Sequence, residues 1–75
     1  MSSTIQSILF SRKERYGWTP SHARYFLDNA GFRKGTLHAT ADYYRFRQAK
    51  PTGYKRMRTI WLSRKYGIKA VVGYK

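Results

Sequence analysis

The chain has 75 residues, of which 16 are Lys or Arg and three are Asp or Glu, so its formal net charge at pH 7 is +13. We expect one domain over residues 1–75, and the absence of cysteine excludes a disulfide framework and a thiolate zinc site. Hydrophobic residues make up 41% of the chain and aromatic residues 17%, which indicates a folded domain rather than a disordered tail.

The first two predicted elements are a strand and a helix. Residues 4–10 are mostly apolar or β-branched, which predicts a strand. Thr19 followed by Pro20 is typical of a helix start, because the threonine hydroxyl accepts from an unpaired backbone amide and proline needs no donor there. Gly31-Phe32 suits a left-handed cap followed by an apolar contact. We therefore expect a helix over residues 20–30, with one apolar stripe formed by Ala23, Phe26, Leu27 and Ala30.

A polar connection and a second strand follow the helix. Residues 33–42 are polar and small, and we expect a loop there. Residues 43–48 alternate in polarity, which predicts a half-buried strand. The alternation sends Tyr44 and Phe46 to the core and places Tyr43, Arg45 and Arg47 on the opposite face.

Two further strands are predicted in the last third of the chain. Residues 50–53, Lys-Pro-Thr-Gly, interrupt the strand pattern. Residues 56–62 and 68–74 then form a hairpin, with Gly67 in its turn. The sequence does not decide which face of the strand at residues 56–62 points toward the core. Burying Ile60 and Leu62 also buries Arg58, whereas the opposite phase buries Met57, Thr59 and Trp61, so a bulge or a strand exposed on two sides would fit.

The order β-α-β-β-β predicts a small α+β domain. A helix with one apolar stripe buries that stripe against one face of a sheet, so we expect a mostly antiparallel sheet with the helix packed on one face. The other sheet face then remains open, and it carries Tyr43, Arg45, Arg47, Lys69 and Val71.

The positive charge is concentrated in the second half of the chain. Residues 43–75 contain ten Lys or Arg and no acid, whereas residues 1–42 contain six bases and three acids. This asymmetry indicates a polyanionic partner, nucleic acid above all, because cations neutralise phosphates and exposed rings stack on unpaired bases. We predict one basic and aromatic binding face, formed by Arg45, Arg47, Lys55, Arg56, Arg58, Arg64, Lys65 and Lys69, with Tyr43 and Trp61 left open between packing and contact.

The same residues offer little for catalysis, and we expect that the chain is not an enzyme. Glu14, Asp28 and Asp42 are too scattered for carboxylate-pair or two-metal chemistry. His22 in the predicted helix and His38 in the predicted loop are too few donors for a metal site. The glycines form no phosphate-binding loop of the P-loop kind. We therefore expect no metal and no cofactor.

A membrane partner is also disfavoured. No stretch approaches the ~18 apolar residues of a transmembrane helix, and the first residues lack the pattern of a signal peptide. The predicted helix carries only Arg24 on its polar face and ends in Asp28-Asn29, unlike a Lys/Arg-rich interfacial helix. We therefore expect neither a transmembrane protein nor one secreted by a signal peptide.

A resemblance to a known family spans nearly the whole chain. Its specific parts are Tyr-Arg-Phe-Arg-Gln at 44–48 and Gly-Ile-Lys-Ala-Val-Val-Gly-Tyr at 67–74, within a pattern that also includes residues 5–10, 16–19, 23–32 and 58–60. This succession resembles a small domain of uncharacterised function that bacteriophages and large DNA viruses encode, alone or fused to head-related proteins. The resemblance implies a viral origin, with the host cell cytoplasm or the virion as location, and supplies no activity. The chain has Arg24, Tyr25 and Asp28 where that family's helix would be lysine-rich, so a shared helix function is not implied.

Three functions are consistent with these features. The first is a module that binds nucleic acid without sequence specificity; about four to six phosphate contacts on duplex DNA predict a slope of about −4 to −5 for log affinity against log salt. The second is a small structural or assembly protein of a virion, whose basic face docks on an acidic protein surface or packaged genome. The third is an inhibitor of a host nucleic-acid-binding enzyme, which needs a similar charge pattern. The open sheet face and edges are also compatible with a homodimer.

Overall fold

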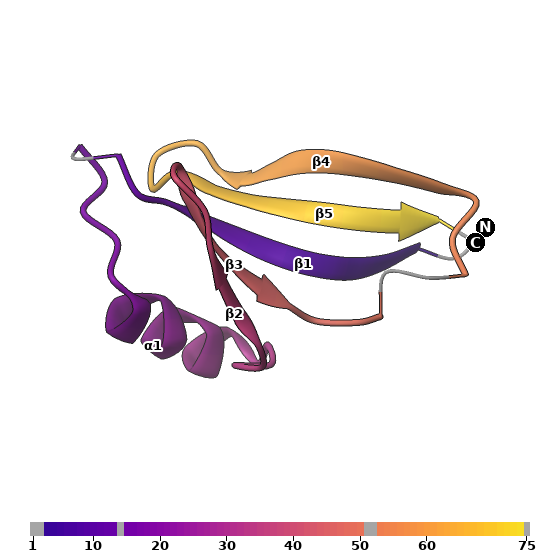
Figure 1. Cartoon of the computed structure of the whole chain (residues 1–75), viewed down its shortest axis with the longest axis horizontal. Coiled ribbons are helices and arrows are strands. Elements are labelled where there is room, and N and C mark those ends of the chain that lie inside the picture. Colours follow the sequence, from indigo (N-terminus) through magenta and orange to yellow (C-terminus); the bar gives the residue numbers. More distant parts are fainter. Residues whose placement is uncertain (1–2, 14, 51–52, 75) are drawn as a thin grey trace.

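The computed structural model describes residues 3–13, 15–50 and 53–74. Within these ranges, five strands form one antiparallel sheet in the order β2-β3-β1-β5-β4. The helix lies near one end of the sheet, and β4 forms the edge remote from it (Figure 1). The predicted α+β class and the order of its elements are therefore confirmed. The elements are β1 (Ser3–Ser11), α1 (Pro20–Ala30), β2 (Leu37–Ala39), β3 (Tyr43–Arg47), β4 (Arg56–Ser63) and β5 (Ile68–Tyr74).

Both ends of α1 are capped as the sequence predicts. The Thr19 hydroxyl accepts from the backbone N–H of His22 at 3.2 Å, which satisfies one of the free donors of the first turn. Gly31 takes a left-handed conformation with φ 80°, and the N–H of Phe32 donates to the carbonyl of Leu27 at 2.8 Å. This six-residue closure satisfies a carbonyl at the end of the helix and turns the chain back toward the sheet.

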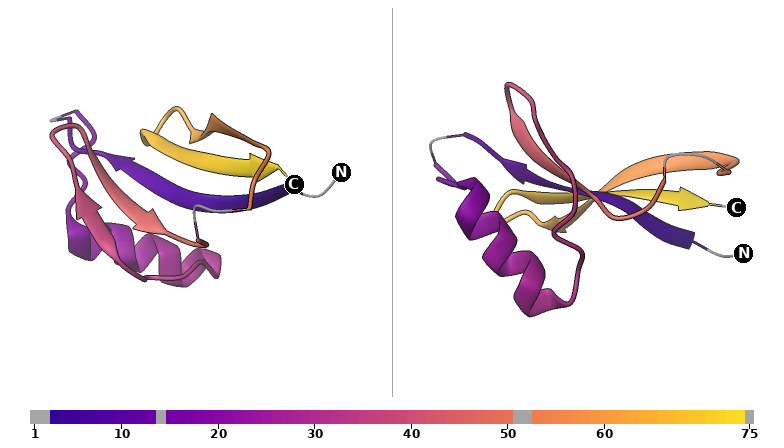
Figure 2. Two further views of the ribbon diagram at one scale, coloured as in Figure 1. Left: turned by 45° about the vertical axis from the view of Figure 1, so that its right-hand side comes forward. Right: turned by 60° about the horizontal axis from the view of Figure 1, so that its bottom comes forward.

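The core lies between α1 and one face of the sheet. It is formed by Ile8, Phe10, Ala23, Leu27, Phe46 and Ile68. Phe10 is central, because its ring centroid lies 4.8 Å from that of Trp18 and 5.7 Å from those of Phe26 and Phe46. Ala30, predicted as part of the helix stripe, is exposed, since the chain turns at the following glycine and Phe32 packs against the core instead. Figure 2 shows the helix on one side of the twisted sheet, which leaves the other face open.

The short strand β2 corrects the predicted loop over residues 33–42. Leu37 pairs with Phe46 and His38 pairs with Arg45, so this segment continues the sheet beyond β3. His38 therefore lies in a strand and not in a loop. Only Leu37 of the three residues is partly buried, so their own sequence carries little strand signal and the pairing with β3 defines the strand.

The edge strand β4 is exposed on both sides and also contains a bulge, the two features that its sequence left open. Seven of its eight residues are exposed, on both faces, and the register with β5 shifts between Trp61 and Ser63, which marks a bulge. Arg58 lies opposite the buried Val72 and so faces the helix side of the sheet. Trp61 lies opposite Lys69 on the open face.

Candidate nucleic-acid interface

Strand register brings half of the predicted binding residues onto the open face. One row of side chains crosses the sheet, because His38 lies opposite Arg45, Arg45 opposite Leu9, Leu9 opposite Lys69, and Lys69 opposite Trp61. Tyr43 precedes Arg45 by two residues in β3 and Arg47 follows it by two, so all three side chains lie on the same face. We call this group the open-face cluster: Tyr43, Arg45, Arg47, Trp61 and Lys69.

Aromatic rings hold the cation at the centre of the cluster. Lys69 Nζ lies 4.5 Å from the ring centroid of Trp61 and 5.2 Å from that of Tyr43. The guanidinium carbon of Arg64, in the turn after β4, lies 5.6 Å from the Trp61 centroid, which extends the cluster by one cation. Cation–π contacts fix these charges against the rings without neutralising them. Trp61 stays 40% exposed, so part of its side chain is accessible to a ligand.

Arg45 is fixed by neutral groups. Its Nε donates to the Ser7 hydroxyl at 3.1 Å, and one terminal nitrogen donates to Gln6 Oε1 at 2.9 Å. Ser7 Oγ also donates to Gln6 Oε1 at 2.6 Å, and Gln6 Nε2 donates to the carbonyl of Ala49 at 3.1 Å. Gln6 and Ser7 are buried, so the half-buried guanidinium is held in place by a network that supplies dipoles and no counter-charge.

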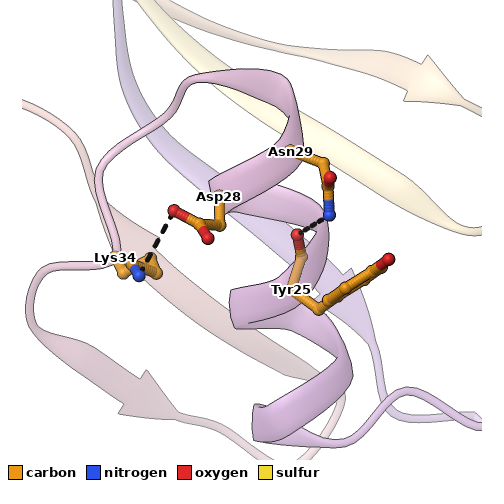
Figure 3. Close-up of polar contacts among 4 residues, drawn as sticks. All are labelled: Tyr25, Asp28, Asn29 and Lys34. Carbon is orange, nitrogen blue, oxygen red and sulfur yellow. Dashed lines mark hydrogen bonds and ion pairs between the residues drawn. The ribbon is translucent and has the colours of Figure 1, made fainter.

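Carboxylates of the described chain do not neutralise the cluster. Among the described residues, a salt bridge joins Lys34 to Asp28, with 3.3 Å between Lys34 Nζ and Asp28 Oδ1. Figure 3 shows this pair at the end of α1, beside the hydrogen bond from the Asn29 side chain to the Tyr25 carbonyl. Lys69 therefore contacts rings, and Arg45 contacts an amide oxygen and a hydroxyl. Such a surface attracts an external anion, because uncompensated positive charges in close proximity repel each other.

Strand register separates two of the other predicted cations from this surface. The β4–β5 register places Arg56 and Arg58 on the helix side of the sheet, so the prediction of one face for all eight cations is wrong for these two. Lys65 lies in the turn between β4 and β5, with its Nζ 5.4 Å from the Tyr66 ring. Lys55 precedes β4, where its backbone N–H donates to the Tyr74 carbonyl at 2.9 Å.

Sequence reasoning missed the residues that organise the cluster. Gln6 and Ser7 lie at a register shift in β1, between Ile5 and Ser7, which directs both polar side chains to the arginine. The polar Gln-Ser pair between Ile5 and Ile8 was the available sequence signal for this contact. Tyr54 was also missed: its ring covers Gly73 so closely that an added Cβ there would lie 2.5 Å from a ring carbon. The ring thereby covers the open face at that end of β5.

The described residues contain neither a metal-ligand cluster nor a membrane-spanning helix. Within them, no group of three or more His, Cys, Asp or Glu side chains gathers as metal ligands would. The helix that the structure describes is too short and too polar to cross a membrane.

Comparison with known proteins yields no relative. No protein-family model matches the chain, and no curated protein or solved structure is significantly similar to it. The resemblance to the small viral domain stays a prediction from the sequence.

Proposed function

We propose that this protein binds nucleic acid through the open-face cluster, gripping backbone phosphates without reading base sequence. The observation that carries the proposal is Arg45, a half-buried guanidinium that is oriented by Gln6 and Ser7 and has no described carboxylate partner. A fixed guanidinium fork matches the geometry of a phosphate, and a nearby anion offsets the cost of keeping the charge partly out of water.

The composition of the cluster favours low sequence selectivity. Contacts to phosphates position a nucleic acid but carry no base information. Tyr43 and Trp61 flank Lys69 and present ring surface, and stacking on a ring is available to every base. These groups bind and orient a polyanion, and we propose a binding role rather than a catalytic one.

An electrophoretic shift series with DNA and RNA tests the proposal. Arg45, Arg47, Arg64 and Lys69 are the cations of the cluster and its extension at Trp61. If each neutralises one phosphate of duplex DNA, log affinity falls against log salt with a slope of about −3.6, slightly shallower than the slope of about −4 to −5 expected from the sequence. A slope near zero, or no shift with any polynucleotide at low salt, contradicts the proposal.

A second candidate function rests on β4. Met57, Ile60, Trp61 and Leu62 are all large, exposed hydrophobic residues of this one edge strand. Exposed apolar edge strands pair readily with another chain. We propose as the alternative an assembly protein, in the virion or the host cell cytoplasm, whose β4 pairs antiparallel with β4 of a second copy. A two-fold axis normal to the sheet would leave both open-face clusters on one side.

Mass measurement by light scattering tests the alternative. At about 0.5 M salt, where repulsion between the copies is screened, a dimer would have twice the chain mass of 8.9 kDa. Ile60→Lys would then give a monomer, because it adds a charge to the paired edge, while Tyr25→Lys, at an exposed helix position, would stay dimeric. A monomer at every salt and protein concentration removes this candidate.

A further inference from the structure

The open face contains a hollow built from side chains of three neighbouring strands. It has a volume of about 290 Å³ and is lined by Gln6, His38, Thr40, Arg45 and Arg47. The register explains the gathering, since β3 lies between β1 and β2, with His38 directly opposite Arg45. Hydrogen-bond donors and positive charges therefore surround the hollow, and its lining contains no carboxylate.

Arg45 enters this hollow in a fixed orientation. A guanidinium carries five N–H donors, and two of its nitrogens are engaged with Ser7 and Gln6. Both acceptors are buried, and Gln6 is itself tied to the Ala49 carbonyl. The donors that remain on Arg45 are therefore oriented before any ligand arrives, which lowers the entropic cost of binding. Gln6 is a positioning residue here, because its oxygen and its amide nitrogen are both used inside the protein.

The chemistry of the lining selects an anion with several free oxygens. Arg45 and Arg47 supply two guanidinium groups, and His38 adds an imidazole. The Thr40 hydroxyl shapes the wall of the hollow, because it already donates to the Tyr43 carbonyl at 3.1 Å. A phosphodiester offers one charge and two free oxygens. A phosphate monoester offers three free oxygens and a charge of about −1.5 to −2 at pH 7, so it satisfies more of these donors at once.

We propose that this hollow binds a phosphate monoester, namely the terminal phosphate of a nucleic-acid strand. The inference rests on the proposed nucleic-acid binding and adds to it a site that distinguishes strand ends. Arg45 and Arg47 hold the terminal phosphate, His38 completes its contacts at the β2 edge, and the strand continues across the open face toward Lys69 and Trp61.

Paired oligonucleotides test this inference. Fluorescence anisotropy is measured at about 0.1 M salt with one single-stranded sequence carrying a 5′-phosphate, a 3′-phosphate or hydroxyl groups at both ends. We expect at least one phosphorylated end to bind about tenfold tighter than the hydroxyl form, as one additional charge-assisted contact would give. Equal binding of all three overturns the inference and leaves the proposed function intact, whereas no binding of any overturns both.

Matched variants locate the preference. Arg45→Lys keeps the charge but removes the fork, so it should abolish the preference for phosphorylated ends while hydroxyl ends still bind. Arg58→Lys makes the same change on the other face of the sheet and should retain the preference. His38→Asn, at an exposed strand position, should weaken it and provides a second readout should Arg45→Lys unfold. A preference that survives both Arg45→Lys and His38→Asn overturns the inference. Displacement of all three oligonucleotides by millimolar inorganic phosphate, with no preference for the phosphorylated ends, also overturns it.

Discussion

The cations predicted to bind lie in different settings on the two faces of the sheet. On the helix side, Arg56 and Arg58 extend from an edge strand into solvent, and Lys34 pairs with Asp28 near the end of α1. On the open face, Arg45 is bonded to two buried neutral side chains and Lys69 lies between two rings. Solvated or paired charges need no further partner, whereas oriented and unpaired ones are stabilised by an external anion. The total charge is therefore less informative than its local setting.

The largest expected effect comes from removing the open-face arginines. Arg45→Gln with Arg47→Gln should weaken binding to duplex or single-stranded DNA about 100-fold at low salt, because two charge-assisted phosphate contacts are lost. Arg56→Gln with Arg58→Gln removes the same charge from the other face and should weaken DNA binding about threefold or less. Anisotropy titrations compare the two proteins. Similar losses in both would show that total charge, and not the open face, governs binding.

The next effect concerns stability at the end of the open face. Gly73→Ala should destabilise the fold by about 2 kcal/mol, since the new methyl group would overlap the Tyr54 ring and force it to move. Gly73→Ala combined with Tyr54→Ala should restore part of that loss, because the overlapping ring is gone. Thermal unfolding followed by circular dichroism measures both. A single variant as stable as the parent would contradict the close packing of the ring on the strand.

A smaller effect is expected at the exposed ring of the cluster. Trp61→Ala should weaken binding to single-stranded DNA about tenfold, as loss of one stacked base would give. Tyr25→Ala, at a ring 73% exposed on the helix, is the matched control and should leave affinity unchanged. Titrations with single-stranded and duplex DNA separate stacking from charge, because a ring that stacks on bases matters only where bases are unpaired. An equal loss on duplex DNA would instead indicate that Trp61 acts by holding Lys69 and Arg64.

The smallest expected effect is at the paired charges of the helix side. Asp28→Asn breaks the bond to Lys34, but both side chains are largely exposed, at 69% and 48%. The stability change should therefore stay below about 0.5 kcal/mol. Chemical denaturation measures it. A loss above about 1 kcal/mol would mean that this pair is more than a solvated contact.

Local patterns were sufficient to predict most of the fold. The capping residues Thr19 and Gly31 define α1, and the alternation in residues 43–48 assigned the faces of β3, because one side of that strand is buried. The strand β2 escaped prediction because it is short, mostly exposed and defined by its partner. The faces of β4 could not be assigned, since an edge strand exposed on both sides has no burial pattern and its register depends on β5.

The candidate site was predictable in part for the same reason. Alternation placed Tyr43, Arg45 and Arg47 on one face. The pairing of β1 with β3 and with β5 confirms that Lys69 lies on the same face. The anchoring of Arg45 required the β1 register shift, a long-range pairing that one sequence does not reveal. The separation of Arg56 and Arg58 from the cluster likewise depends on strand pairing.

The salt dependence of duplex DNA binding, measured for the parent and for Arg45→Gln with Arg47→Gln, is the most direct test of the proposed interface. If the open face grips phosphates, the double substitution should make the slope of log affinity against log salt shallower by about 1.8, or about 0.9 for each lost phosphate contact. Arg56→Gln with Arg58→Gln should leave the slope within about 0.5 of the parent value. An unchanged slope in the open-face variant would contradict binding through this surface.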